Sequence, residues 1–181
     1  MITIFFNTLI QIMSKYNNKY SAEEWSNRVN LAACYHLADI FGLSDIIWNH
    51  ITAKTQKDKD TFLINPFGLR YDEVTASNLV EINSEGKIIN GKHKINDTGY
   101  IIHGAIHKNI KQIHCVMHSH SRAGLAISST KEGLKPMIQD AAIFYNRVSY
   151  HDWEGMSTEA EECESLAKDL GSNKVMILKN H

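Results

Sequence analysis

The sequence predicts an α/β protein, an α/β/α sandwich with a central mixed, largely antiparallel sheet flanked by helices. Three observations lead to this fold class. One long, capped helical pattern stands near the N-terminus, short strand-like and helix-like segments alternate after it, and turn residues separate them. Interleaved helices and short strands are typical of a sheet covered by helices. With 181 residues and no repeat or linker, we expect one domain at 21–181 after an extension at 1–20.

The N-terminal extension is apolar but short. Residues 1–13 read MITIFFNTLIQIM, a stretch interrupted by Asn7, Thr8 and Gln11 and without an early positive charge. A membrane-spanning helix needs about 20 apolar residues, and a signal peptide needs a cleavage site of small residues. We therefore expect no membrane span here. The stretch is either a short packed or frayed helix, or an upstream extension of a chain whose natural start is Met13.

The first long helix is expected from Ala22 to Phe41. Ser21 and Glu24 have the spacing of a capping box, in which each side chain accepts a hydrogen bond from a free backbone N–H. Gly42 is a natural C-terminal stop. Apolar residues at helical spacing predict the face that packs on the sheet. They are Trp25, Val29, Ala32, Cys34 or Ala33, and Leu37.

Short strands and shorter helices follow. The strands are expected at 46–52, 61–64, 79–82, 87–89, 113–117, 148–150 and 174–179. The helices are expected at 100–107, at 123–128 after a Ser121 cap, at 139–145, and from a cap at Ser157 or Thr158 to about Leu170. A charged turn joins the first two strands, which predicts a hairpin, and Asn65 to Gly68 has turn chemistry.

A metal site is suggested at the ends of two strands. His118 and His120 follow an apolar run, and residues i and i+2 of a strand point to the same face. His181 follows a second apolar run and could complete the site from another strand. Three imidazoles leave one position of a tetrahedral ion open, as in catalytic zinc sites.

Spacing does not single out the third ligand. The other histidines remain alternatives, and two of them, His103 and His107, have the i, i+4 spacing of ligands on a helix. The alternatives are His36, His50, His93, His103, His107, His114 and His151. The sequence has no G-x-S-x-G, G-x-G-x-x-G or Walker motif, so nothing supports a serine hydrolase or a nucleotide-binding loop.

Charge and cysteine content narrow the setting. The net charge of -1 provides no basic field for nucleic acid, so no nucleic-acid partner is expected. Three cysteines without C-x-x-C spacing fit a reducing compartment, and we expect a cytoplasmic protein. Cys115 alternates to the face opposite His118, which predicts a core position.

Several blocks of the sequence resemble the class II aldolase/adducin family. The blocks lie between Asn30 and His181, and their wording is similar to the adducin branch. They are NLAACYHLADIFG (30–42), WNHIT (48–52), FLINPFGL (62–69), YDEVTAS (71–77), HSH (118–120) and LKNH (178–181). The resemblance implies an α/β/α sandwich, a homotetramer with sites at subunit interfaces, and a metal, normally zinc though another divalent ion would serve, on His118, His120 and His181.

The resemblance also implies substrate contacts, with two departures from the family. By position, Asn49, Gly68 and the pair Asp97-Thr98 correspond to the loop groups that hold a substrate phosphate. Gly99 stands where the family has its catalytic Glu, which leaves Asp97 as a weak acid/base candidate. Asp97 also occupies the place of a phosphate-binding hydroxyl, and a carboxylate there repels a phosphate.

Two functions from different classes follow. The first is a metal-dependent lyase of the class II aldolase type, acting on a small hydroxy-carbonyl (sugar-like) compound. The second is a non-catalytic scaffold like the adducin head, self-associating and with a vestigial metal site; actin or cytoskeletal binding would come by analogy with adducins. Family members continue past the position of His181, so we expect a domain that lacks the C-terminal elements.

Overall fold

The computed structural model describes residues 19–57, 59–155 and 160–181. For residues 160–163 it describes the backbone alone. Its main sheet has five antiparallel strands in the order β4-β3-β2-β1-β5, and a second sheet pairs β6 with β7 in parallel. The strands are β1 (His50–Lys54), β2 (Thr61–Ile64), β3 (Val80–Asn83), β4 (Ile88–Asn90), β5 (Cys115–His118), β6 (Val148–His151) and β7 (Val175–Leu178).

The helices lie at most of the expected places. They are α2 (Ala22–Ile40), α3 (Asp97–Asn109), α4 (Arg122–Ser128), α5 (Gln139–Ala142) and α6 (Ala160–Leu170), with a 3-10 turn, η1, at Tyr71–Glu73. Ser21 and Ser121 cap α2 and α4 as expected, each through a hydrogen bond from a backbone N–H three residues on. The expectations for residues 1–13, Ser157 and Thr158 lie outside the described residues.

Helices cover both faces of the main sheet. Strand β2 shows why, because its side chains alternate between two cores. Leu63 belongs to a cluster with Leu31 and Tyr35 of α2. Phe62 and its neighbour two residues on belong to a second cluster, against which Tyr100 of α3 packs. The predicted α/β/α layering is therefore confirmed.

The buried face of α2 agrees with the predicted one only in part, since Trp25 and Ala32 are buried as expected but the other predicted residues are not. Val29 and Leu37 are 39% and 51% exposed, and Ala33 and Cys34 are exposed as well. The buried side of the helix instead carries Arg28 among its apolar residues, which are Trp25, Leu31, Ala32, Tyr35 and Ala38. The prediction counted only apolar residues and so assumed that Arg28 is exposed. The face that it selected is therefore turned around the helix axis relative to the face that is buried.

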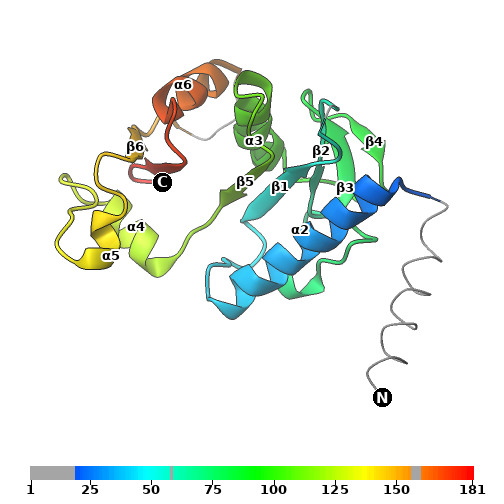
Figure 1. The fold of residues 1–181 in the computed structure, drawn as a ribbon, viewed down its shortest axis with the longest axis horizontal. Coiled ribbons are helices and arrows are strands. Elements are labelled where there is room, and N and C mark those ends of the chain that lie inside the picture. The colour runs from blue at the N-terminus through cyan, green and yellow to red at the C-terminus, as the bar shows by residue number, and fades with distance from the viewer. Residues whose placement is uncertain (1–18, 58, 156–159) are drawn as a thin grey trace.

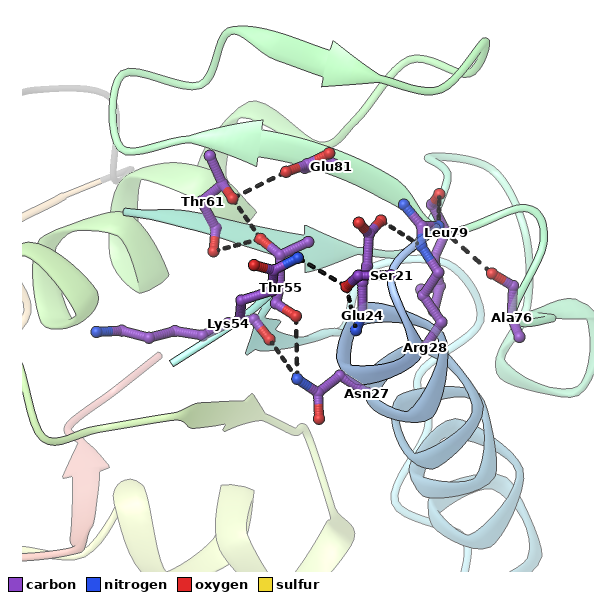
Figure 2. A network of polar contacts seen from close by, with 11 residues as sticks. Ser21, Glu24, Asn27, Arg28, Lys54, Thr55, Thr61, Ala76, Leu79 and Glu81 are labelled. Carbon is purple, nitrogen blue, oxygen red and sulfur yellow. Dashed lines mark hydrogen bonds and ion pairs between the residues drawn. The ribbon is translucent and has the colours of Figure 1, made fainter. Parts of the chain in front are cut away.

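Arg28 is buried with two of its three guanidinium nitrogens hydrogen-bonded (Figure 2), while Nη2 has no hydrogen-bond partner among the described residues. Its Nε donates to Glu24 Oε1 at 2.9 Å, and its Nη1 donates to the carbonyl oxygen of Leu79 at 2.8 Å. Asn27, one residue before, donates to the carbonyl oxygen of Thr55 at 3.0 Å. Buried charges are tolerated when they are paired and hydrogen-bonded. The network ties α2 to β1 and to the segment that enters β3.

Strand β1 starts four residues later than predicted. Ile46 has φ 48°, in the left-handed region that a β-branched residue rarely adopts, and Trp48 donates its backbone N–H to the carbonyl of Asp45. Residues 45–48 therefore form a turn, in which Ile46 and Trp48 are 68% and 54% exposed. The apolar run in the sequence extends across this turn and suggested a longer strand.

Strand β5 leads from the main sheet toward the part of the molecule that contains α4, α5, α6 and the second sheet (Figure 1). It pairs with β1 so that His118 lies opposite His50 and Cys115 lies opposite Ala53. Cys115 is exposed rather than in the core, since β5 is an edge strand of the main sheet. In the part of the chain that the structure describes, none of the helices has the length and apolarity needed to cross a membrane.

Candidate metal centre

Three histidines from two distant parts of the chain meet at one point. His118 is the last residue of β5, His120 lies two residues on, and His181 follows β7. Nε2 of His118 is 2.9 Å from Nε2 of His120 and 3.2 Å from Nε2 of His181. The structure therefore brings together the three residues that the sequence suggested as ligands, and it brings them together through β5 and β7.

The spacing of these nitrogens fits a divalent ion. One ligand atom from each histidine lies within 4.8 Å of the others. Tetrahedral zinc with bonds of about 2.0–2.1 Å places its ligand nitrogens about 3.3 Å apart. The separations of 2.9 and 3.2 Å lie close to that value, and all three side chains are half-buried. The donor set suits zinc and other ions that accept imidazole nitrogen.

Asp45 supports the site and was missed by the sequence analysis. Its Oδ2 accepts a hydrogen bond from Nδ1 of His120 at 3.0 Å. A proton on Nδ1 leaves Nε2 bare, and a carboxylate behind a ligand histidine is the usual outer partner of a zinc site. Asp45 belongs to the turn before β1, where Ile46 has its unusual φ. The local sequence gives no sign that this turn faces a segment 75 residues away.

Burial keeps the His118 and His181 imidazoles in the neutral form that binds metals. It lowers the pKa of His118 well below its usual value, with the neighbouring His50 as the next cause. It also lowers the pKa of His181, and His120 adds to that effect. Desolvation disfavours the charged imidazolium, so neutral rings with a free lone pair are favoured.

Three of the alternative histidines lie beside the triad and form a buried row. His50 stacks on His118, with ring centroids 5.0 Å apart and planes 19° apart. Nδ1 of His50 is 3.1 Å from Nε2 of His103. The Thr52 hydroxyl lies 2.8 Å from Nδ1 of His103 and 2.9 Å from Nε2 of His107. All four side chains are buried, and a single-strand pattern could not reveal the row because it crosses between β1 and α3.

The remaining alternatives have other surroundings. His36 contacts the carbonyl oxygen of Val74, and His151 contacts Asp169. His93 and His114 are exposed. None of these four belongs to the group of three ligand atoms within the described residues.

Gly99 is packed against the buried row. A Cβ placed on it would lie 3.0 Å from Cδ2 and 3.1 Å from Cγ of His50, and 3.2 Å from Cδ1 of Ile64. The His50 imidazole thus fills the space into which a side chain at position 99 would extend. A carboxylate at this position requires His50 to move.

The predicted substrate contacts have different environments. Asn49 is 2% exposed, and both Nδ2 and Oδ1 of its side chain lack a hydrogen-bond partner among the described residues. Gly68 has φ 91° in the turn after β2. The Thr98 hydroxyl donates to Oδ1 of Asn96 at 2.8 Å, at the cap of α3, and Asp97 is exposed in the first turn of that helix. An unpaired buried carboxamide is costly unless a ligand uses it, so Asn49 is the strongest of these contacts.

Two cavities lie near the triad. The smaller, of about 170 Å³, is lined by all three ligand histidines together with Ser119, Ser121 and residues of α4. The larger, of about 540 Å³, lies between α3, β5 and β7 and is lined by mostly apolar side chains. Only His118 of the three ligands reaches the larger cavity, so the smaller one is the space in front of the metal-binding nitrogens.

The chain matches the family described as the class II aldolase and adducin N-terminal domain, over residues 29–181. This chain belongs to that family. A class II relative from Pseudomonas aeruginosa, provisionally named as an aldolase class 2 protein, is 44% identical over 162 residues. That match covers 89% of this chain and 62% of the relative. Alpha-adducin of Rattus norvegicus is 42% identical over 166 residues, which cover 90% of this chain and 22% of the adducin.

Solved structures of the family share the fold. The crystal structure of an aldolase II superfamily protein from Pseudomonas syringae has a TM-score of 0.88 and 43% identity, and the match covers 91% of this chain and 67% of that one. L-fuculose 1-phosphate aldolase from Glaciozyma antarctica PI12 has a TM-score of 0.78 and 32% identity, with 88% and 63% of the two chains covered. The class II aldolase and adducin family thus includes a named sugar-phosphate aldolase and a named adducin, both above 30% identity to this chain.

Proposed function

We propose that this chain is a zinc-dependent lyase of the class II aldolase type, which makes or breaks a carbon–carbon bond in a small hydroxy-carbonyl compound. The observation that carries the proposal is the convergence of His118, His120 and His181, with Asp45 behind His120. Three imidazoles with an outer carboxylate form the ligand set of a catalytic rather than a structural zinc site, because one position stays open. The likeness to L-fuculose 1-phosphate aldolase supports the substrate class.

The protein groups would hold and orient the substrate. A bound divalent ion supplies Lewis acidity for a carbonyl or enediolate oxygen. The buried Asn49 carboxamide offers a donor and an acceptor that no described residue uses. We assign supporting contacts to Gly68 and Thr98, and proton transfer to Asp97. Its side chain is shorter than the family's Glu, and it lies two positions before Gly99, where that Glu would stand. General acid–base catalysis typically contributes about 10²–10⁴ in rate, so we expect slow turnover.

We further propose a cytoplasmic homo-oligomer, a tetramer by family resemblance. The exposed side of α2 supports self-association, since Val29, Leu37, Ile40 and Phe41 are 39%, 51%, 74% and 73% exposed on one helix and its end. Apolar groups gathered on a surface mark an interaction site. A second copy of this chain is the occupant we propose, and sedimentation equilibrium measures the resulting mass.

Metal analysis and turnover test the lyase proposal together. The purified protein is expected to retain about one equivalent of zinc by mass spectrometry, and His118→Ala is expected to lose it. His93→Ala, which removes an exposed histidine outside the centre, serves as the matched control. Retro-aldol cleavage is then followed with a panel of phosphorylated and unphosphorylated hydroxy-carbonyl compounds. A protein without stoichiometric metal would contradict the proposal, as would a zinc-loaded protein that cleaves none of them.

A second candidate function is a non-catalytic scaffold, and one observation favours it specifically. Gly99 leaves the family's acid/base position without a carboxylate, and the His50 ring occupies the adjoining space. The 42% identity to alpha-adducin agrees with this candidate, for which we propose cytoskeletal binding of the adducin kind. Co-sedimentation with filamentous actin, in the absence of any turnover, would favour the scaffold.

A further inference from the structure

The ligand histidines are oriented in two different ways. His120 has a carboxylate partner, because its Nδ1 donates to Asp45. For His118, the described hydrogen bonds of the side chain involve Nε2 alone. The ring of His118 is stacked on the ring of His50, with the two ring centroids 5.0 Å apart and the two ring planes at 19°. The orientation of His118 therefore depends on how firmly His50 is held.

His50 is held from behind by a buried hydrogen-bonded row. The row runs from Nδ1 of His50 to His103, from His103 to the Thr52 hydroxyl, and from Thr52 to Nε2 of His107. His103 and Thr52 are 0% exposed, and His50 and His107 are 2% and 4% exposed. Water therefore cannot replace a missing partner without opening the core. His107 closes the far end by stacking on Phe62, with ring centroids 4.9 Å apart.

The single proton of the Thr52 hydroxyl couples the rings. Thr52 can donate to only one of the two imidazoles and must accept from the other. If it donates to Nδ1 of His103, then His103 carries its proton on Nε2 and donates to His50. If it donates to His107, then His103 accepts from Nδ1–H of His50. Each arrangement fixes one tautomer for every ring, so removal of the hydroxyl frees His107 and leaves His50 and His103 coupled only to each other.

Burial supports neutral rings throughout this row. It lowers the pKa of His50 to about 3 and that of His107 to about 4, and it lowers the pKa of His103 well below the usual value. A neutral imidazole has one donor and one acceptor nitrogen, which is what the row requires of His103.

We propose that Thr52, His103 and His107 are positioning residues of the metal centre, which hold the His50 ring against His118 and thereby orient that ligand. The inference rests on the proposed metal centre and deepens it. It assigns the role of an outer ligand partner to a stacked ring in place of a hydrogen bond. Loss of an outer partner typically lowers metal affinity by about 10–100-fold.

Zinc affinity of the full chain, measured by competition with a chromophoric chelator, tests the inference. Thr52→Val keeps the shape but removes the hydroxyl, and we expect it to weaken zinc binding by about tenfold. Thr52→Ser restores the hydroxyl and should restore the affinity. Thr55→Val is the matched control, because it removes another buried hydroxyl of the same segment, one that donates to the Thr61 carbonyl.

The outcomes separate the inference from the proposed function. If His118→Ala weakens zinc binding but Thr52→Val does not, the metal centre stands and the positioning role is overturned. If His118→Ala leaves zinc binding unchanged, the metal centre itself is overturned. If Thr52→Val does not fold, nitrogen NMR of the histidine rings in the unmodified protein decides instead. Tautomers of His50, His103 and His107 that match either of the two arrangements support the row, and a combination that neither arrangement allows overturns it.

Discussion

The His50 imidazole lies where a side chain on residue 99 would begin: a Cβ on Gly99 would be 3.0 Å from Cδ2 of His50. Gly99 is buried in the first turn of α3, and His50 is buried at the start of β1. The two residues are therefore complementary in volume. A side chain at position 99, where the family resemblance places the acid/base residue, and the buried histidine row compete for the same space.

Gly99→Ala is expected to destabilise the protein. The added methyl group overpacks against His50 and Ile64, which typically costs about 1–3 kcal/mol, while alanine in a helix recovers up to about 1 kcal/mol. We expect a net loss of about 1 kcal/mol in the free energy of unfolding, measured with urea. In a His50→Ala background the same change should be neutral or stabilising. Additive effects of the two substitutions would show that the residues do not compete for space.

The pair also determines how a latent aldolase should be tested. Gly99→Glu alone places a carboxylate against the His50 ring, and we expect it to fold poorly. Combining it with His50→Ala makes room, although it removes the stack on His118. The double variant is expected to gain retro-aldol turnover relative to His50→Ala alone. Equal turnover by the two proteins would count against a latent aldolase.

Asp45→Asn is expected to weaken metal binding without unfolding the protein. The amide keeps the shape of the side chain and an acceptor oxygen but removes the negative charge that strengthens the hydrogen bond from His120. We expect zinc affinity to fall by about 10–100-fold. Asp72→Asn, at an exposed carboxylate paired with Arg70, is the matched control and should bind zinc like the unmodified protein. Equal affinities of the two variants would remove Asp45 from the centre.

Metal-free protein should lose stability as the pH falls through the range set by His107. Burial lowers the pKa of His107 to about 4, against about 6.5 in the unfolded chain. Between these values the unfolded state binds the extra proton. Stability is therefore fully present above about pH 6.5 and declines toward pH 4, by at most about 1.4 kcal/mol per pH unit for one histidine. Urea unfolding in chelator should show a shallower decline for His107→Gln than for His93→Gln, and identical declines would contradict the assignment.

Removal of the buried guanidinium of Arg28 should be costly. Arg28→Met leaves the Glu24 carboxylate buried without its partner and the Leu79 carbonyl without a donor. Breaking a buried pair from one side typically costs about 3–5 kcal/mol. Replacing both partners, with Glu24→Gln and Arg28→Met, should restore part of that loss. A double variant less stable than Arg28→Met would show that the unpaired charge is not the cause.

Features that depend on neighbouring residues could be predicted from the sequence. The caps Ser21 and Ser121, the stop at Gly42 and the strand at 61–64 were confirmed, because capping and alternation act within a few residues. His118 and His120 lie close together as expected, although only His118 belongs to β5. His181 was selected by its setting and by family resemblance, and the structure brings it to 3.2 Å from His118 through the placement of β7.

Features that depend on distant partners could not be predicted in this way. The predicted face of α2 was only partly right, because Arg28 and Tyr35 are buried there. Their polar atoms are stable in the interior because they bond to the backbone of Leu79, just before β3, and of Ile51 in β1. The exposed position of Cys115 depends on β5 being an edge strand.

By itself, the sequence determined most of the kinds and order of the elements, since these follow from periods of 3.6 and 2 residues and from local caps. It also pointed to the H-x-H pair of the candidate metal centre. Only the tertiary structure decided that Asp45 lies behind His120 and that His50, Thr52, His103 and His107 form one buried row. The physical reason is that a buried polar group is stable only beside a partner, and these partners come from other strands and helices.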